Sequence, residues 1–387
     1  MVPQLVAKRA RHLAESVRLR GRELGVLPGV PVPTRNVGVR ERPVFEAAGS
    51  PASVTWLGAV PPTPIARAST AGTPRREFDD LHAAGLPARD MLVLSLPGAS
   101  LATDGGAVIT ANGELVYDTL WDDPHYERSE FSSGRRLPPA TAIAGTCASV
   151  ISLWHANYHH WLFDALPRLA VLELAGQGSL PVIVPEHLSS FQRDTLDLLG
   201  YTADRRRPFT RGHVRPETLV WPSPASQIGF PSRYVVEWLR REIRPWIATP
   251  ASSGRRLFLS RSLAPTRHIR NEAAVIAALS AYGFETVNAE RLTFRQQVEL
   301  FSAAEAVVAP HGAGTSNIVF GEHIAVLEIL QPEYLNLCYY ALAGACEHDY
   351  SYMFAEPVGR PGKESDLVVD VVQLIEAVEQ MLVRVDA

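Results

Sequence analysis

The 387-residue sequence has few cysteines, no long apolar run and no strong excess of charge of either sign. Its three cysteines, Cys147, Cys338 and Cys346, have no CxxC spacing. This argues against a disulfide scaffold or a zinc–thiolate site and favours a reducing compartment. No stretch approaches the roughly 20 apolar residues that cross a bilayer. The formal net charge of −4 gives no indication of nucleic-acid binding.

The first 24 residues have the pattern of a basic amphipathic helix. Residues 3–24 place apolar side chains on a narrow stripe, with Lys and Arg on the other faces. Lys8, Arg9 and Arg11 would interrupt the apolar part of a signal peptide, so we expect a cytoplasmic protein. Two interpretations stay open: the helix packs on its own domain, or it lies on anionic lipid at the inner face of the plasma membrane. Liposome flotation with and without residues 1–24 separates them.

The first third of the remaining chain has weak periodicity. A Pro-rich stretch at 27–74 predicts an irregular wrapping segment. Short apolar runs follow at 91–96, 107–110 and 115–118. The Ala-Asn-Gly turn at 111–113 predicts a hairpin between the last two runs. We therefore expect a small antiparallel β-hairpin decoration near the N-terminus.

From residue 141 onward, predicted strands alternate with predicted helices. The strands are expected at 142–149, 181–184, 218–221, 256–260, 285–288, 306–309 and 325–329. The helices are expected at 158–175, 189–199, 233–246, 272–281, 294–303, 315–320 and 368–385. This alternation predicts parallel sheets with helices on both faces. The segment 250–254, sequence PASSG, has the composition of a hinge between two such units.

These patterns predict an α/β protein in three parts. Residues 1–75 form the basic helix and wrapping segment, 76–250 a first Rossmann-like domain and 251–387 a second. The length and the 46% content of hydrophobic residues suit two domains of ordinary size. Two such domains place a ligand cleft at their interface.

The predicted strand at 306–309 leads into a turn of small residues and then a helix. The turn consists of His311, Gly312, Ala313 and Gly314, followed by hydroxyl donors on Thr315 and Ser316. Small residues let a phosphate approach the backbone, and a helix N-terminus favours negative charge. The same glycines also suit a tight turn that binds nothing, so the sequence alone leaves both interpretations open. The pattern is neither a Walker loop nor GxGxxG.

Two charged residues are expected near the ends of neighbouring strands. Glu328 lies among apolar strand residues, where an unpartnered carboxylate is costly. Ribose hydroxyls or a neighbouring arginine would satisfy it, and we favour the ribose. Arg261 follows the strand at 256–260, where a guanidinium can clamp phosphates. For Arg270 we expect a surface ion pair, whereas for Arg267 an ion pair and a contact with the ligand both stay open.

The segment 154–168 has the densest group of histidines and aromatic residues. His160 and Asp164 are four apart and share a helix face, so His160 oriented by Asp164, or Asp164 itself, is a candidate base. Asn157 is a candidate N-cap, and Pro167 should kink the helix. Trp161 suits either the site or the core.

Three chemistries compete for this segment. A zinc site through His155 and His159 lacks an HExxH glutamate and an obvious third ligand. His159, His160 and Asp164 also fit the HHxxxD pattern of acyltransferases, although Ala165 follows instead of glycine. The third chemistry is activation of a sugar acceptor.

Taken together, the motifs resemble those of glycosyltransferase family 61. The matching pieces are the segments 157–168, 257–261 and 310–314, then Asn317 and the segment 327–329, in the family's order. The resemblance implies a GT-B fold of two Rossmann-like domains facing a central cleft, inversion at the anomeric carbon and no required metal or cofactor. It further implies a nucleotide-sugar donor, with a UDP-sugar as first choice. The chain departs from the family at 321–323, where a Pro-Gly turn is common, and at Thr315, where Leu is frequent; both leave the nucleobase and sugar pockets open.

The predicted site divides into three groups. Asp164 and His160 are the catalytic candidates. The donor-binding candidates are Ser260, Arg261, His311, Gly312, Ala313, Gly314, Thr315, Asn317 and Glu328. The acceptor-side candidates are Asn157, His159, Trp161 and Arg168.

The sequence therefore predicts a glycosyltransferase that moves a sugar from a nucleotide sugar to a glycan hydroxyl. The resemblance suggests capsular or other cell-surface polysaccharide synthesis, with no nucleic-acid partner. Two alternatives stay open: an HHxxxD-type acyltransferase, and a regulator that binds sugar nucleotides without catalysis.

Overall fold

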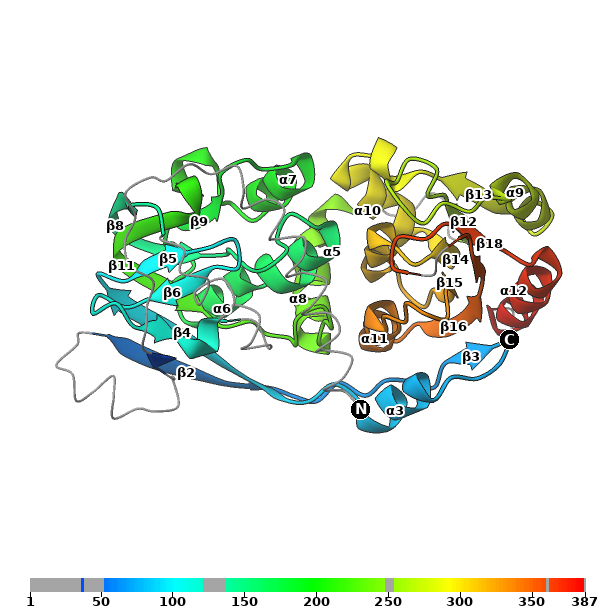
Figure 1. The fold of residues 1–387 in the computed structure, drawn as a ribbon, viewed down its shortest axis with the longest axis horizontal. Helices are drawn as coiled ribbons and strands as arrows, with labels where there is room; N and C mark the ends of the chain where they lie inside the picture. Colours follow the sequence, from blue (N-terminus) through cyan, green and yellow to red (C-terminus); the bar gives the residue numbers. More distant parts are fainter. Residues whose placement is uncertain (1–35, 38–51, 121–136, 248–253, 360–361, 386–387) are drawn as a thin grey trace.

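A computed structural model describes residues 36–37, 52–120, 137–247, 254–359 and 362–385, and these form a mixed α/β protein with two large sheets (Figure 1). The predicted helix at 3–24 and most of the predicted hinge at 250–254 lie outside the described residues. Among the described helices, none is long and apolar enough to cross a membrane.

The first sheet has ten strands and is built by the N-terminal half of the chain. Its strands are β1 (Asn36–Val37), β2 (Ser53–Val60), β4 (Arg89–Pro97), β5 (Ser100–Ala102), β6 (Ala107–Ile109), β7 (Leu115–Val116), β8 (Thr141–Ser149), β9 (Val182–Pro185), β10 (Arg206–Phe209) and β11 (His213–Pro222). The strands β11, β8, β9 and β10 pair in parallel, whereas β4 and β5 pair antiparallel with β11. The strands from residue 141 onward are therefore parallel, as expected. The sheet as a whole is mixed because the antiparallel strands that precede residue 141 join it.

The predicted hairpin is present, but it belongs to this main sheet. β6 and β7 pair antiparallel around the turn at 111–113, where Gly113 has a φ of 78°. β6 pairs with β5, which pairs with β11 at the centre of the sheet. The stretch at 27–74 is also less irregular than predicted, because it contains β2. Seven of the eight residues of β2 are exposed or half-buried, which explains the weak periodicity of this edge strand.

The helices of the N-terminal half pack on this sheet. They are α5 (Tyr158–His160), a π-helix (Trp161–Ala165), α6 (Arg168–Leu174), α7 (Ser190–Leu198) and α8 (Arg233–Ile243). The helix predicted at 158–175 is thus interrupted: α5 widens into the π-helix, and Pro167 precedes α6 as its N-cap. Short 3-10 turns lie at Tyr117–Thr119, Ala203–Arg205, Thr210–Gly212 and Arg244–Trp246.

The second sheet has six strands, all parallel. Its strands are β3 (Ser69–Thr70), β12 (Arg255–Leu259), β13 (Phe284–Val287), β14 (Ala304–Pro310), β15 (Ala325–Leu330) and β16 (Asp349–Phe354). The spatial order β13-β12-β14-β15-β16-β3 reverses direction between β12 and β14. In doubly wound sheets, ligands bind beyond the carboxyl ends of the strands at such a reversal.

Helices cover both faces of the second sheet. They are α9 (Glu272–Ser280), α10 (Phe294–Ser302), a 3-10 helix (Ala313–Phe320), α11 (Cys338–Ala345) and α12 (Val371–Val385), with a 3-10 turn at Ala289–Arg291. α9 and α12 share an apolar cluster on one face, whereas α10 and α11 lie on the side nearer the first sheet (Figure 1). The short strands β17 (Glu356–Pro357) and β18 (Leu367–Val368) pair with each other.

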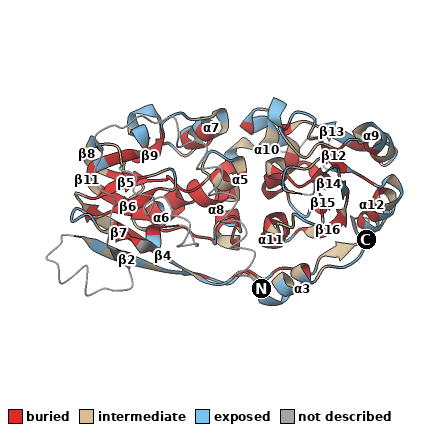
Figure 2. Ribbon diagram, viewed as in Figure 1, coloured by how far each residue is buried: buried red, intermediate tan, exposed pale blue. Residues whose placement is uncertain are grey.

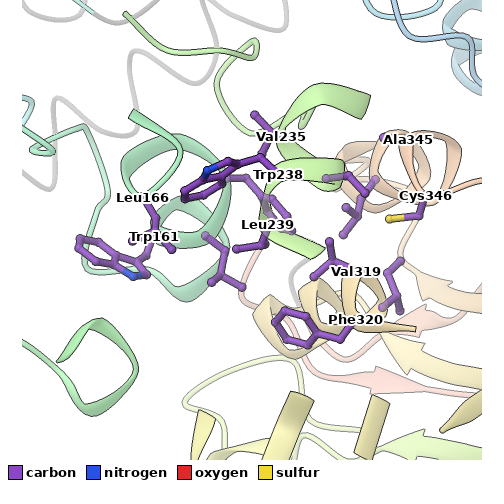
Figure 3. Packing of buried hydrophobic residues seen from close by; sticks show 14 of the residues in the cluster. Trp161, Leu166, Val235, Trp238, Leu239, Val319, Phe320, Ala345 and Cys346 are labelled. Carbon is purple, nitrogen blue, oxygen red and sulfur yellow. The ribbon is translucent and has the colours of Figure 1, made fainter. Parts of the chain in front are cut away.

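A single apolar cluster joins the two halves of the chain. Figure 3 shows Trp161 and Trp238 from the N-terminal half near Val319, Phe320 and Cys346 from the C-terminal half. Buried residues are concentrated in the central strands of both sheets and in the helices between them (Figure 2). The two sheets are therefore parts of one packed molecule.

The chain before β4 contributes to both sheets. β2 pairs with β4 of the first sheet, and β3 pairs with β16 of the second. Helix α3 (Arg76–Ala84) lies between β3 and β4 in the chain. Its Phe78 stacks on Tyr352 of β16, with the ring centroids 3.9 Å apart. The domain boundaries at residues 76 and 251 stay a prediction.

Candidate functional site

His160 and Asp164 form a hydrogen-bonded pair at the start of the interrupted helix. Nδ1 of His160 lies 2.6 Å from Oδ2 of Asp164. The His160 side chain is 18% exposed and that of Asp164 only 2%. π-helical turns often occur at functional sites, and here one holds the carboxylate inward. Asp164 therefore orients the ring, and the imidazole is the member of the pair that reaches solvent.

The loop after β11 fixes this pair from the other side. The backbone N–H of Gly229 donates to both oxygens of Asp164, at 3.0 and 3.3 Å. The carbonyl of Gly229 accepts from Nε2 of His159 at 3.1 Å, which fixes the tautomer of that ring. Gly229 has a φ of 78°, a conformation that favours glycine. It is thus a positioning residue.

His311 has the same kind of partner on the second sheet. Its Nδ1 lies 2.6 Å from Oε1 of Glu328, and the other oxygen of Glu328 accepts from the hydroxyl of Tyr350. Burial and the nearby carboxylate raise the pKa of Tyr350 well above its ordinary value, so this hydroxyl stays a donor. Glu328 is 0% exposed. Its direct contact with a ribose, expected from the sequence, is therefore not available in this arrangement, and its role here is to orient His311.

A row of ring contacts brings the two histidine pairs together across the two halves. The ring of His159 lies 5.5 Å from that of His160 and 5.3 Å from that of Tyr339. The ring of Tyr339 in turn lies 4.9 Å from that of His311. Nδ1 of His159 also lies 3.0 Å from the hydroxyl oxygen of Ser316. The segment 157–168 and the turn at 311–314 therefore belong to one cluster.

Arg261 lies against the small-residue turn. It follows β12, and His311 follows β14, so both lie at the strand ends that flank the reversal of strand order. A Cβ added to Gly312 would lie 1.8 Å from Nη1 of Arg261. The guanidinium donates to the carbonyl of Thr266 at 2.9 Å. Burial, and secondly the charge of Arg267, lower the pKa of Arg261 to about 10.

Arg267 is a second guanidinium near this turn. Its backbone has a φ of 62°, in the region that side chains rarely adopt. Its Nη1 donates to the carbonyl of Lys363 at 3.2 Å, and among the described residues its buried Nε has no partner. The surface ion pair expected for Arg270 is present, to Asp366 at 2.8 Å. Arg267 instead lies over the ring of Tyr334, 5.7 Å from its centroid.

The residues from Gly312 to Asn317 differ in their burial and in whether their polar side chains already have hydrogen-bond partners. Gly312 is buried, whereas Ala313 and Gly314 are half-buried. The hydroxyl of Thr315 is buried and lacks a partner in the part of the chain that the structure describes. Asn317 is 0% exposed, accepts from the hydroxyl of Tyr158 at 2.6 Å and donates to the carbonyl of Gly314 at 3.0 Å. Thr315 therefore keeps a donor for a ligand, while Asn317 holds the turn.

The other predicted residues lie outside the cluster or support it. The hydroxyl of Ser260 is hydrogen-bonded to Oε1 of Glu272 at 2.8 Å. Asn157 caps α5, as expected, by accepting from the backbone N–H of His159. Trp161 is 0% exposed and belongs to the core. Arg168 lies in a separate hollow of the N-terminal half.

Several members of the cluster carried no recognised sequence signal. Tyr339 belongs to α11, which is buried throughout and so lacks amphipathic periodicity. Gly229 lies in a loop where glycine is common. Tyr350 lies on β16, a strand that the alternation did not include. Their roles depend on contacts between segments distant in sequence.

The zinc interpretation fails on geometry. Both ring nitrogens of His159 are taken, one by Ser316 and one by Gly229. Nδ1 of His155 lies 2.8 Å from the carbonyl of Ser152. No group of three His, Cys, Asp or Glu residues suited to a metal ion occurs within the described ranges.

A doubly wound sheet with cationic and imidazole groups at its reversal, facing an oriented histidine, is an arrangement suited to group transfer. The class is shown by the family model Glycosyltransferase 61, which matches residues 158–327, from α5 to β15. The segment from α5 to β15 therefore belongs to glycosyltransferase family 61. No curated protein matches it. Family membership implies a sugar donor and an acceptor as substrates and removes the support for the acyltransferase alternative.

Proposed function

We propose that this glycosyltransferase moves a sugar from a nucleotide-sugar donor to a hydroxyl of a glycan, with inversion at the anomeric carbon and without a metal ion. The observation that carries the proposal is the meeting of Arg261, Gly312 and His311 at the reversal of strand order in the second sheet. This is where doubly wound sheets bind nucleotides. We further propose a GT-B-like arrangement in which the second sheet binds the donor and the first sheet the acceptor.

The donor's diphosphate would lie against the turn at 311–314. Arg261 and Arg267 supply two guanidinium groups, and their mutual repulsion is relieved when an anion binds between them. The unpartnered hydroxyl of Thr315 and the first backbone N–H groups of the 3-10 helix add donors. These groups stabilise the negative charge of the leaving diphosphate, the task for which many enzymes use a metal ion.

His160 is the proposed base. Nδ1 faces Asp164, so Nε2 is the nitrogen that can accept a proton from the acceptor hydroxyl. Asp164 is almost fully enclosed and holds two hydrogen-bond partners, His160 and Gly229. The sequence left open which of the two residues is the base. These contacts favour His160 as the base and Asp164 as the carboxylate that orients it.

The first experiment is a thermal-shift screen of UDP-, GDP- and CMP-sugars, followed by transfer assays with the nucleotide sugar that binds. We expect a UDP-sugar to bind in the presence of EDTA. Replacing His160 by glutamine should lower kcat by about 100- to 10,000-fold, the range for loss of a general base, while the donor Kd stays within twofold. Arg261→Ala should instead weaken donor binding by about tenfold or more, because a charge-assisted contact is lost.

The matched control is His82→Gln. His82 lies in α3, and its imidazole contacts the carbonyl of Ile65. This variant should leave kcat and donor Kd unchanged. Near-normal turnover by His160→Gln would overturn the base assignment. A nucleotide sugar that binds but is neither hydrolysed nor transferred to any glycan would favour the regulator without catalysis.

The family also suggests a cellular role, which we add to the proposal. We propose synthesis of capsular or other cell-surface polysaccharide on the cytoplasmic side of the membrane. The proposed lipid contact of residues 1–24 is tested by liposome flotation of the full chain and of a chain lacking them. Equal absence of flotation by both would end that hypothesis.

A further inference from the structure

A small polar hollow opens in the N-terminal half, away from the donor turn. Arg89, Asp118, Ser152, Arg168, Trp221 and Ile228 are among its lining residues. It lies where β11 ends and α6 begins, since Trp221 belongs to the former and Arg168 to the latter. Apart from Arg168, an acceptor-side candidate from the sequence, none of these lining residues has a role in the mechanism proposed above.

Three residues that line this hollow each carry a buried donor without a partner. In the described part of the chain, Nε of Arg168, Nε1 of Trp221 and the hydroxyl of Ser152 make no hydrogen bond. The three residues are 4%, 2% and 2% exposed. Buried polar groups in native proteins nearly always have partners, so three such groups on one hollow indicate a missing ligand.

The charges of the hollow favour an anion. Two arginines, Arg89 and Arg168, and one carboxylate, Asp118, line it. The guanidinium of Arg168 lies over the Trp221 ring, 5.1 Å from its centroid, and donates to the carbonyl of Pro222 at 2.8 Å. Burial lowers the pKa of Arg168 to about 10. The nearby charge of Asp164 favours the cation but offsets only part of the effect of burial, so an anion bound directly to Arg168 stabilises it further.

The hollow adjoins the proposed base. Its lining residue Leu153 is followed by Trp154, whose ring lies 4.8 Å from that of His160. Its lining residue Ile228 is followed by Gly229, which holds Asp164. Both walls therefore continue into the residues that surround the His160–Asp164 pair. A substrate bound with one group in the hollow has its neighbouring atoms near this pair.

We propose that this hollow binds an oxyanionic group, a carboxylate or a phosphate ester, carried by the acceptor glycan. The inference rests on the proposed function, because it names the substrate class on the acceptor side of that site. The oxyanion accepts hydrogen bonds from Arg168, Trp221 and Ser152. The acceptor hydroxyl then lies near Nε2 of His160.

An ordered water is the alternative occupant. A water satisfies the hydrogen bonds of a small polar site, but it does not neutralise the charge of Arg168. An oxyanion does both, since its oxygens accept from all three donors and its charge opposes the guanidinium. The two occupants can be told apart because only an oxyanion site binds charged sugars more tightly than neutral ones.

The test is isothermal titration of the full chain, without donor, at constant ionic strength. The probes are glucuronic acid, glucose 6-phosphate, glucose and inorganic phosphate. We expect at least one of the two charged sugars to bind about tenfold or more tightly than glucose, and the tighter one identifies a carboxylate or a phosphate ester. Equal binding of glucose and both charged sugars, no binding of any sugar, or binding of inorganic phosphate with no gain from an attached sugar would each overturn the proposal.

Three variants locate the binding. Trp221→Phe and Ser152→Ala each remove one donor with little change in shape, and Arg168→Met removes the charge. Each should weaken binding of the preferred charged sugar, by about fivefold or more, with the largest loss for Arg168→Met. The matched control is Arg205→Met, because Arg205 also lies over an aromatic ring, that of Tyr201, and donates to a carbonyl, that of Gly178. Unchanged affinity in all three variants would overturn the assignment.

The outcome is separate from that of the proposed function. Anion binding is measured without turnover, so it can be found even in a chain that transfers nothing. Conversely, transfer to a neutral glycan with no preference for charge overturns the hollow's role and leaves the glycosyltransferase mechanism intact.

Discussion

At the scale of single residues, the site is built around two histidines that each face a buried carboxylate through Nδ1. His160 pairs with Asp164 and His311 with Glu328, both at 2.6 Å. A carboxylate in this position fixes the tautomer and the ring orientation and leaves Nε2 for substrate. One pair lies on each half of the molecule, which suits proton removal from the acceptor and contact with the leaving group.

The first prediction concerns Gly312, whose backbone lies against the guanidinium of Arg261. Gly312→Ala places a Cβ 1.8 Å from Nη1 of Arg261, so the guanidinium must move away from the turn. We expect donor affinity to fall by about tenfold, equivalent to about 1.4 kcal/mol, as measured by titration of the nucleotide sugar.

A second glycine of the same turn is the comparison. A Cβ on Gly314 would meet only the Cβ of Ala289 at 3.6 Å and Leu259 at 3.9 Å, which are ordinary contacts. Gly314→Ala therefore leaves Arg261 in place and should cost less affinity than Gly312→Ala. If Gly312→Ala bound donor as tightly as the unchanged protein, the placement of Arg261 in the donor site would be wrong.

At the scale of elements, the interrupted helix from Tyr158 to Leu174 explains why a run of unusual residues splits between site and core. His160, the last residue of α5, stays partly exposed, whereas Trp161, the first residue of the π-helix, packs inward. The indole Nε1 of Trp161 donates to the hydroxyl of Thr195 on α7 at 2.9 Å. The acceptor-side role expected for Trp161 is therefore replaced by a structural one, since a fully buried ring cannot reach a glycan.

The second prediction tests this role of Trp161. Trp161→Phe removes the hydrogen bond and part of the ring volume, so the free energy of unfolding should fall by about 1–3 kcal/mol. Urea denaturation measures this change. The acceptor KM should stay within twofold.

A double-mutant cycle with Thr195→Val isolates the hydrogen bond. Both variants remove the same interaction, so together they should destabilise the protein by less than the sum of the two single changes. Additive effects would mean that the hydrogen bond contributes nothing, and a large rise in acceptor KM in Trp161→Phe would restore the role at the acceptor.

At the scale of the whole molecule, a few polar contacts and a shared apolar cluster join the two halves. Tyr158 donates to Asn317, and His159 contacts Ser316. Both contacts link α5 of the N-terminal half to the 3-10 helix after the donor turn. The turn proposed to bind the donor is therefore linked by direct contact to the segment that carries His160.

The third prediction concerns the pH dependence of folding. Burial lowers the pKa of both His159 and His348 from 6.5 to about 4. The unfolded chain therefore binds protons that the folded chain excludes, and stability falls as the pH drops from about 6.5 toward 4. Each histidine contributes at most about 3 kcal/mol to this loss. Above about pH 8 both histidines are neutral in either state, and their contribution to stability is constant.

Chemical denaturation at several pH values measures this slope. His159→Gln should lower the stability at pH 8 through lost packing, yet reduce the slope between pH 6.5 and 4. His82→Gln, outside this contact, should keep the original slope. An unchanged slope in His159→Gln would show that this ring is not held neutral between the two halves.

Most of the second sheet could be predicted from the chain alone. The apolar runs at 256–260, 306–309 and 325–329 lie within β12, β14 and β15 or extend one residue beyond them. Buried parallel strands have such continuous runs, and helices with one polar face separate them. Two elements that the sequence did not predict lack such a pattern. Helix α11 is buried throughout, and β2 of the first sheet is an exposed edge strand.

The sequence by itself determined the alternation of elements, the family and the position of the two histidine motifs, because these depend on residues near one another in the chain. Only the tertiary structure decided what those residues do. It enclosed Glu328 and Trp161 and left His160 partly exposed. It also left the hydroxyl of Thr315 without a partner among the described residues and placed Arg261 against Gly312. Burial and hydrogen-bond partners arise from segments far apart in sequence, and they decide whether a carboxylate binds a substrate or orients a neighbour.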